Sequence, residues 1–319
     1  GNIKMAFKLI DEAKKANADA IKFQSFKADQ TVTKLAKKAH YAKSVTNKYQ
    51  SQYQMQKSLE LTNHEHILLK KYCKKKNIEY LSSAFDIPSL EFLYKLKINQ
   101  FKIPSGEIVN YQYLKKLASF RKKIVLSTGM STITEIANAI KILCKNGVKK
   151  EEIIILHCNS EYPTPFSDVN LKAMLHLRKK FKIPTGLSDH TLGIEVPIAA
   201  AAMGACYIEK HFTLSRKLKG PDHKASITPT ELKQMIISIR NIEKALGEYK
   251  KKVTISEKKN INLVRKSIVA IKEIKKGEIF TEKNIGLKRP GVGISPTKFY
   301  KVLGKKSNFF FKYDQLIKL

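Results

Sequence analysis

Short apolar runs alternate with longer amphipathic stretches through the first 247 residues of the chain. The longer stretches, such as residues 2–16, 133–144 and 171–181, place apolar residues at helical spacing. Each short run is typical of a buried strand, so the alternation predicts repeated strand–helix units built on a parallel sheet. The runs lie at residues 20–24, 79–83, 100–103, 124–127, 153–157, 184–187 and 206–209.

Helix start and stop signals support this division. Thr62 and Thr132 each precede a glutamate by three residues, the pattern of a capping box, while Thr228 followed by proline predicts a further helix that ends at Gly247. Seven strand–helix units in about 250 residues predict an α/β fold, a (β/α)8 TIM barrel whose first strand is missing from the N-terminus. A doubly wound open sheet is the alternative, but no G-x-G-x-x-G motif follows any of the runs.

The pattern changes after the barrel domain, which we place at residues 1–247. Residues 248–263 are rich in Lys, Glu and Ser without an apolar period and are interpreted as a linker. Residues 264–319 are expected to form a small β-rich module that leans on the barrel or on a second subunit. Its short strands are predicted at 266–271, 279–281 and 285–288. Within the barrel, residues 25–61 exceed an ordinary connection and predict a functional loop or lid.

The chain is strongly basic, because 61 Lys and Arg minus 27 Asp and Glu leave a net charge of +34. The lysines are scattered along the polar faces of the helical patterns, so we interpret them as solvated residues that also help to attract an anionic substrate. This interpretation predicts no nucleic-acid partner. A basic protein that binds polyanions remains a distant alternative.

Cysteine usage and hydropathy indicate the cellular compartment in which the protein works. The four cysteines stand far apart without a C-x-x-C pair, which predicts reduced thiols and a cytoplasmic protein. No apolar run approaches about 20 residues, so no membrane partner is expected.

Two histidines, His190 and His211, lie where two successive apolar runs end. An Ala-rich stretch of helical length at residues 194–204 separates them, so the two strands are expected to be parallel neighbours. Both imidazoles then emerge at the edge where α/β folds place their chemistry. The sequence therefore predicts half of a divalent metal site, with water or substrate completing it.

Two lysines interrupt apolar runs, Lys22 and Lys102. A lysine inside a strand is costly unless it faces a polar cavity or an anion. Small hydroxyl side chains follow several of the same strands, although any one of them is more often a turn or cap residue. Together the lysines and hydroxyls predict a cradle for phosphate or carboxylate. The hydroxyl residues are Ser83, Ser105, Ser127, Ser160 and Ser188, and Glu107 follows closely on Ser105.

The other histidines carry weaker signals. His157 lies within an apolar run and is interpreted as a hydrogen-bonded core residue. His223 receives no role from the sequence. Asp222, which precedes it and follows a Gly-Pro turn, could equally form a structural turn or contact a substrate hydroxyl. His40, His64, His66 and His176 occupy polar contexts and are expected to be solvated.

A set of ordered strings resembles the sialic acid synthase family, and the resemblance spans nearly the whole chain. The C-terminal strings resemble its antifreeze-like, or SAF, domain. The variants are most similar to those of bacterial N-acetylneuraminate synthases. The strings lie at residues 101–107, 126–130, 161–165, 187–191, 208–213, 220–226, 265–270 and 288–296.

The resemblance implies an enzyme that condenses phosphoenolpyruvate with N-acetylmannosamine and water to give N-acetylneuraminate and phosphate. It also implies a domain-swapped homodimer and a divalent metal cofactor, Mn²⁺ or Mg²⁺. Legionaminic and pseudaminic acid synthases, which use a 2,4-diacetamido hexose, are the alternatives.

Residue roles follow from the same resemblance. His190 and His211 match the metal ligands, and Glu107 and Lys102 join them as expected catalytic residues. The sugar is expected to contact Glu107, Tyr162, Asp222 and Arg289, the arginine reaching in from a partner's antifreeze-like domain. Phosphoenolpyruvate is expected to contact Lys22, Ser83, Lys102, Ser105, Ser127, Ser160 and Ser188.

The chain departs from the family pattern at its start. The opening strand with its active-site glutamate is missing, so the chain is expected to be a fragment. In residues 41–50 the match is blurred, and Asn47 receives no role.

Overall fold

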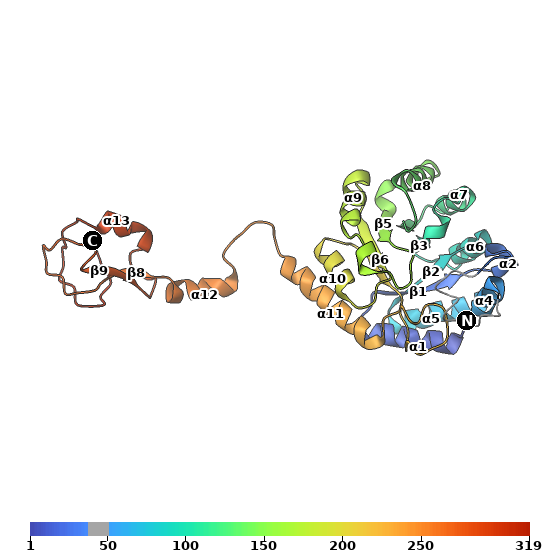
Figure 1. Cartoon of the computed structure of the whole chain (residues 1–319), viewed down its shortest axis with the longest axis horizontal. Helices are drawn as coiled ribbons and strands as arrows, with labels where there is room; N and C mark the ends of the chain where they lie inside the picture. Colours follow the sequence, from blue (N-terminus) through green and yellow to red (C-terminus); the bar gives the residue numbers. More distant parts are fainter. Residues whose placement is uncertain (38–50) are drawn as a thin grey trace. The chain divides into compact units, whose positions relative to one another are not determined.

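The computed structural model describes residues 1–37 and 51–319. The chain divides into two units, Gly1–Gly247 and Glu248–Leu319, which are described separately (Figure 1). The fold class predicted from the sequence, a parallel α/β barrel followed by a small β module, is confirmed.

The first unit is built on a curled parallel sheet. Among the described residues it has seven strands that follow one another in chain order, with each strand parallel to the next. Figure 1 shows helices surrounding these strands. The strands are β1 (Ala20–Ser25), β2 (Glu79–Ala84), β3 (Gln100–Ile103), β4 (Lys123–Ser127), β5 (Ile153–Cys158), β6 (Thr185–Asp189) and β7 (Ile208–Lys210).

The surrounding helices begin where the sequence places capping residues. Capping boxes form at Thr62, Thr132 and Thr228, each with the glutamate three residues on, and so satisfy backbone N–H groups that the first helical turn leaves unpaired. The helices are α1 (Ile3–Lys15), α5 (Asn63–Lys76), α6 (Ile87–Lys95), α7 (Tyr111–Ala118), α8 (Ile133–Lys145), α9 (Lys172–Phe181), α10 (Glu195–Ala202) and α11 (Pro229–Leu246). No helix in the described ranges combines the length and apolar character that a membrane crossing requires.

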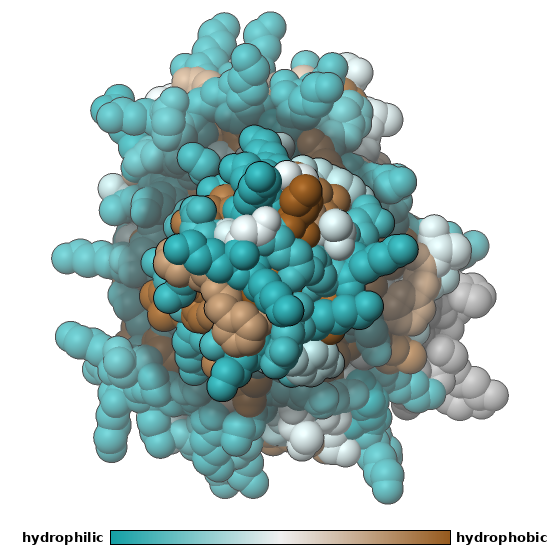
Figure 2. Space-filling model, turned by 90° about the vertical axis from the view of Figure 1, so that its left-hand side faces the viewer, coloured by the Kyte–Doolittle hydropathy of each residue, from teal (hydrophilic) through white to brown (hydrophobic). Residues whose placement is uncertain are grey.

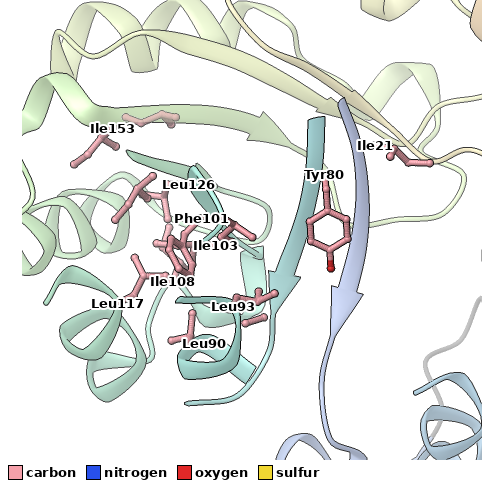
Figure 3. Close-up of a cluster of buried hydrophobic side chains, with 14 of the residues drawn as sticks. Ile21, Tyr80, Leu90, Leu93, Phe101, Ile103, Ile108, Leu117, Leu126 and Ile153 are labelled. Atoms are coloured by element: carbon pink, nitrogen blue, oxygen red, sulfur yellow. The ribbon is translucent and has the colours of Figure 1, made fainter. Parts of the chain in front are cut away.

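The core of this unit lies between the sheet and the outer helices. Phe101 and Ile103 of β3 and Leu126 of β4 are at most 1% exposed, and Figure 3 shows them beside Leu90 and Leu117 of helices α6 and α7. Burial of each such side chain contributes about 1.5–3 kcal/mol. Since the outward positions of the strands form this core, the alternate positions face the barrel interior.

The segment predicted to be a long loop or lid, residues 25–61, has two short helices in its described parts, 25–37 and 51–61. They are α2 (Ala28–Thr31) and α4 (Gln52–Leu59). The hydroxyl of Tyr53 donates to Asp29 at 2.6 Å, and the backbone N–H of Ala28 donates to Glu60 at 2.7 Å, so the helices are tied together. His40 and Asn47 lie outside the described residues.

The second unit has its own small core, centred on Ile268, Phe280 and Phe311. Strand β8 (Ser267–Ala270) pairs antiparallel with β9 (Ile285–Lys288), and a short helix, α13 (Phe299–Val302), follows. Helix α12 (Ile255–Val264) occupies much of the segment interpreted as a linker. Figure 2, in which this unit faces the viewer, shows a mostly hydrophilic surface interrupted by small hydrophobic patches.

The prediction of a strand at residues 279–281 is wrong. Ile279 forms an isolated bridge with Lys306 rather than part of a ladder. The reason is local: the Asn284 side chain accepts from the N–H of Thr281 at 2.7 Å and donates to the Ile279 carbonyl at 2.9 Å. These bonds fold the segment into a turn that competes with strand pairing.

The expectation that His66 is solvated is also wrong, because helix α5 packs this side chain against strands β1 and β2. His66 is 1% exposed, and its ring atoms lie 3.1 Å from the Ser25 hydroxyl and 2.8 Å from the Tyr80 hydroxyl. Burial lowers the pKa of His66 to about 4.

His66 is therefore expected to make stability depend on pH. Its folded pKa lies below the unfolded value of about 6.5, so its contribution is complete above pH 6.5 and is lost as the pH falls towards 4. In urea denaturation, the stability advantage of the wild type over His66→Gln should shrink by about 1–2 kcal/mol between pH 7 and pH 5. The exposed His176→Gln serves as control, and an advantage that stays constant with pH would contradict the assignment.

Candidate active site

Two lysines and a glutamate meet inside the barrel. The Glu209 carboxylate of β7 lies 2.5 Å from the Lys22 ammonium of β1 and 3.4 Å from the Lys102 ammonium of β3. The Lys102 side chain is 6% exposed, and its ammonium donates to the Ser127 hydroxyl at 2.6 Å. Three strands that are distant along the chain thus place their charges in one cluster.

The charged groups in this cluster shift one another's pKa values. Burial lowers the pKa of Lys22 to about 8, although Glu209 opposes the shift. Burial alone would raise the pKa of Glu209, but Lys102 and Lys22 hold it well below its usual value. Two ammonium groups against one carboxylate leave an excess positive charge in a polar interior. Such a site suits an anion.

Hydroxyl groups surround the same cluster. The Ser188 hydroxyl of β6 donates to Glu209 at 2.8 Å, and Ser83 of β2 is 2% exposed in direct register with Lys102. The register of the sheet brings these serines to the lysine cluster, because each serine lies at an interior position of a neighbouring strand.

Ser105 and Ser160 converge on the backbone of Gly129. The N–H of Gly129 donates to the Ser105 hydroxyl at 3.0 Å. A Cβ atom at Gly129 would lie 2.3 Å from the Ser160 oxygen and 2.8 Å from the Ser105 oxygen. Hydroxyls from the β3 and β5 ends and a backbone amide from the β4 end therefore share a space that only glycine leaves open.

The substitution Gly129→Ala is expected to displace both hydroxyls and so to weaken binding of the phosphate- or carboxylate-bearing substrate that the lysines and hydroxyls predict. Its KM should rise by about 10- to 100-fold, since a hydrogen bond to a charged group contributes about 1.5–3 kcal/mol. Steady-state kinetics measure this. Gly106→Ala is the matched control, because a Cβ there meets nothing within 4 Å. Equal KM values for the two variants would contradict a role for this space in binding.

The two imidazoles lie together at the ends of β6 and β7, as predicted. The ring centroids of His190 and His211 are 5.2 Å apart, and the Tyr162 ring lies 4.1 Å from the first and 5.3 Å from the second. The Nδ1 atom of His190 lies 2.5 Å from the Asn159 carbonyl oxygen, and Nδ1 of His211 lies 3.6 Å from Asp222. Burial lowers the pKa of both histidines to about 4, so both are neutral at pH 7.

This arrangement fits a divalent metal in part. Neutral imidazole is a metal ligand, and the bond from Nδ1 of His190 to a carbonyl leaves its Nε2 as the ligand atom, which is the usual arrangement. Within the described ranges no group of three or more His, Cys, Asp or Glu side chains is placed to hold an ion. The described residues thus offer two imidazole ligands, and water and substrate could fill further positions.

Glu107 lies in a 3-10 turn (Ser105–Glu107) after β3 and accepts from the Asn110 amide at 2.7 Å. Burial raises the pKa of its carboxyl group, as it does for Asp222. Arg289 lies exposed in the second unit.

His157 and His223 have local partners. His157 contacts the Val169 carbonyl at 2.6 Å, and His223 contacts the Thr213 hydroxyl at 2.7 Å.

Two residues of the site, Glu209 and Cys158, were not predicted from the sequence. Glu209 lies in the string at residues 208–213, but the sequence assigns it no role. It precedes His211 by two residues and so shares its face of the strand. That spacing could have identified it. Cys158, for which the sequence predicts only a reduced thiol, has its sulfur 3.9 Å from Nδ1 of His190 and 3.8 Å from the Ser105 hydroxyl.

Comparison with known proteins indicates which sugar-acid synthases this chain is similar to. The chain is 52% identical over 318 residues to the N,N'-diacetyllegionaminic acid synthase of Campylobacter jejuni, covering 100% of this chain and 95% of that protein. It is 43% identical to the same enzyme of Legionella pneumophila, covering 96% and 86%. The crystal structure of an N-acetylneuraminic acid synthetase from Leptospira borgpetersenii, in complex with citrate, is 36% identical with a TM-score of 0.71, covering 82% of this chain and 86% of that one.

These relatives correct the expected activity. The prediction of an N-acetylneuraminate synthase is wrong, because proteins 52% and 43% identical over nearly the whole chain are N,N'-diacetyllegionaminic acid synthases.

Family models match both units. The model of the NeuB family covers residues 9–251, and that of the SAF domain covers residues 265–318. The chain therefore belongs to the NeuB family of sugar-acid synthases and carries a C-terminal SAF domain.

Proposed function

We propose that this protein condenses phosphoenolpyruvate with a 2,4-diacetamido hexose and water, giving an N,N'-diacetyllegionaminic acid and phosphate. The observation that carries the proposal is the 52% identity, over the entire chain, to a synthase of that product. The excess positive charge inside the barrel supports the anionic substrate.

The cluster in the barrel interior would bind phosphoenolpyruvate. Lys22 and Lys102 supply fixed ammonium groups for its phosphate and carboxylate, and the excess positive charge needs such a counter-ion. The hydroxyls add hydrogen-bond donors around the same space. They belong to Ser83, Ser105, Ser127, Ser160 and Ser188.

The histidine pair would act at the sugar aldehyde. His190 and His211 would hold Mn²⁺ or Mg²⁺, which when bound supplies Lewis-acid polarisation of the aldehyde oxygen. Tyr162 and Asp222, which lie beside these rings, would contact the sugar. Burial raises the pKa of the Glu107 carboxyl, which suits it to proton transfer as the enol carbon attacks and water adds to the phosphate-bearing carbon.

Further parts of the proposal come from the family resemblance. A homodimer would bring Arg289 of one subunit to the sugar in the site of another. All four cysteines are free, which fits a reducing compartment such as the cytoplasm.

A side-by-side assay tests the substrate. Phosphate release from phosphoenolpyruvate would be measured with Mn²⁺ and, in parallel, a 2,4-diacetamido hexose of the legionaminic configuration, its stereoisomers or N-acetylmannosamine. We expect kcat/KM for the legionaminic precursor to exceed that for N-acetylmannosamine at least about 10-fold, since a site that hydrogen-bonds a substituent rejects the analogue lacking it. A preference for N-acetylmannosamine, or for a stereoisomer, would overturn the proposal.

A further inference from the structure

A buried ion pair lies immediately before the two histidines. Asp189 ends strand β6 and precedes His190, while Lys210 ends strand β7 and precedes His211. The two residues are direct neighbours in the register, and their charged groups are in contact. Their side chains are 2% and 1% exposed, respectively.

The pair is fully hydrogen-bonded. The Lys210 ammonium also donates to the Thr191 carbonyl at 2.7 Å. The Asp189 carboxylate accepts from the Thr191 N–H at 3.0 Å and from its hydroxyl at 2.9 Å. The bonds therefore fasten the end of β7 to the residues on both sides of His190.

The ion pair does not face the substrate cluster. Ser188 and Glu209, the neighbours that precede Asp189 and Lys210, contact each other inside the barrel. Because side chains alternate along a strand, Asp189 and Lys210 lie on the opposite, helix-covered face. They act on the chemistry only through the histidines that follow them.

Stability alone does not explain this pair. Removing two charges from water costs about as much as their attraction returns, and well-packed apolar residues often stabilise as much or more. The pair fixes the distance and the register between the ends of strands β6 and β7. We propose that Asp189 and Lys210 are positioning residues that set the separation and orientation of His190 and His211 for metal binding. The inference rests on the metal role proposed for these histidines.

The test is the double variant Asp189→Leu/Lys210→Met, which leaves no unpaired buried charge. Mn²⁺ affinity of the metal-free protein would be measured by titration calorimetry, beside the urea unfolding midpoint. We expect a folded protein whose midpoint falls modestly, because the buried N–H and carbonyl of Thr191 lose their partners. The Mn²⁺ Kd should be about 10- to 100-fold higher, the range found when residues that orient metal ligands are lost. The KM for phosphoenolpyruvate should stay constant while kcat falls, because the lysine cluster is untouched.

Arg216→Met is the matched control, since it breaks an ion pair of the same unit, with Glu231 at 2.8 Å, that adjoins neither histidine. If the double variant fails to fold, Asp189→Asn keeps the shape of the side chain and its acceptor for the Thr191 N–H but removes the charge opposite Lys210, and it should still weaken Mn²⁺ binding. A folded variant with wild-type Mn²⁺ affinity overturns the inference. A wild-type protein that binds no Mn²⁺ overturns it together with the metal site, whereas sugar turnover tests the proposed function separately.

Discussion

Exchanging Lys102 for methionine is expected to lower kcat/KM for phosphoenolpyruvate by about 10²- to 10³-fold. Methionine keeps the length of the side chain but removes the ammonium group that contacts Ser127 at 2.6 Å and Glu209 at 3.4 Å. Loss of one partner from a buried, hydrogen-bonded charge pair costs about 2–5 kcal/mol. Without Lys102, a single ammonium faces Glu209, and the excess positive charge that favours the anionic substrate disappears.

Lys123→Met provides the matched control for this experiment. Lys123 also lies in a barrel strand, but at the exposed start of β4, so its removal should leave kcat/KM unchanged. Both variants would be checked for folding by circular dichroism before kinetics. If folded Lys102→Met retained wild-type kcat/KM, the lysine cluster would not be the binding site for phosphoenolpyruvate.

Replacement of His211 by alanine is expected to raise the Mn²⁺ Kd at least about 100-fold and to abolish most phosphate release. Direct ligands matter more than residues that orient them, whose loss already costs about 10- to 100-fold in affinity. In this protein two imidazoles, with ring centroids 5.2 Å apart, would supply all of the histidine ligation. Removal of one ring leaves a single ligand, which cannot compete with water for a divalent ion.

His176→Gln is the control, because His176 lies exposed on helix α9. Its Mn²⁺ affinity and turnover should equal those of the wild type. Unchanged Mn²⁺ affinity in His211→Ala would exclude the histidine pair as the metal site. Lost turnover with retained affinity would instead assign His211 to substrate contact alone.

Much of the candidate site could be predicted from where polar residues stand in the apolar runs. Parallel strands bring their carboxyl ends to one edge, so His190 and His211 had to lie near each other once the intervening helix was recognised. The same logic placed Lys22 and Lys102 in the interior, because a lysine within a buried strand needs a polar surrounding.

Contacts between strands far apart in the sequence could not be predicted in this way. Glu209 belongs to β7, and only the curling of the sheet brings it to Lys22 on β1, where the ion pair forms. His66 looked solvated because its neighbours along the helix are polar, yet the packing of α5 against the sheet buries it. Side-chain hydrogen bonds of Asn284 removed a strand that the apolar pattern predicted.

The sequence by itself determined the order of strands and helices, the helix starts and the edge of the sheet where the chemistry gathers. These follow from spacing, capping and strand direction, which are local properties of the chain. The tertiary structure decided which charges pair. The Lys22–Glu209–Lys102 cluster and the Asp189–Lys210 pair depend on the curvature and register of the sheet, which bring together side chains that no local pattern connects.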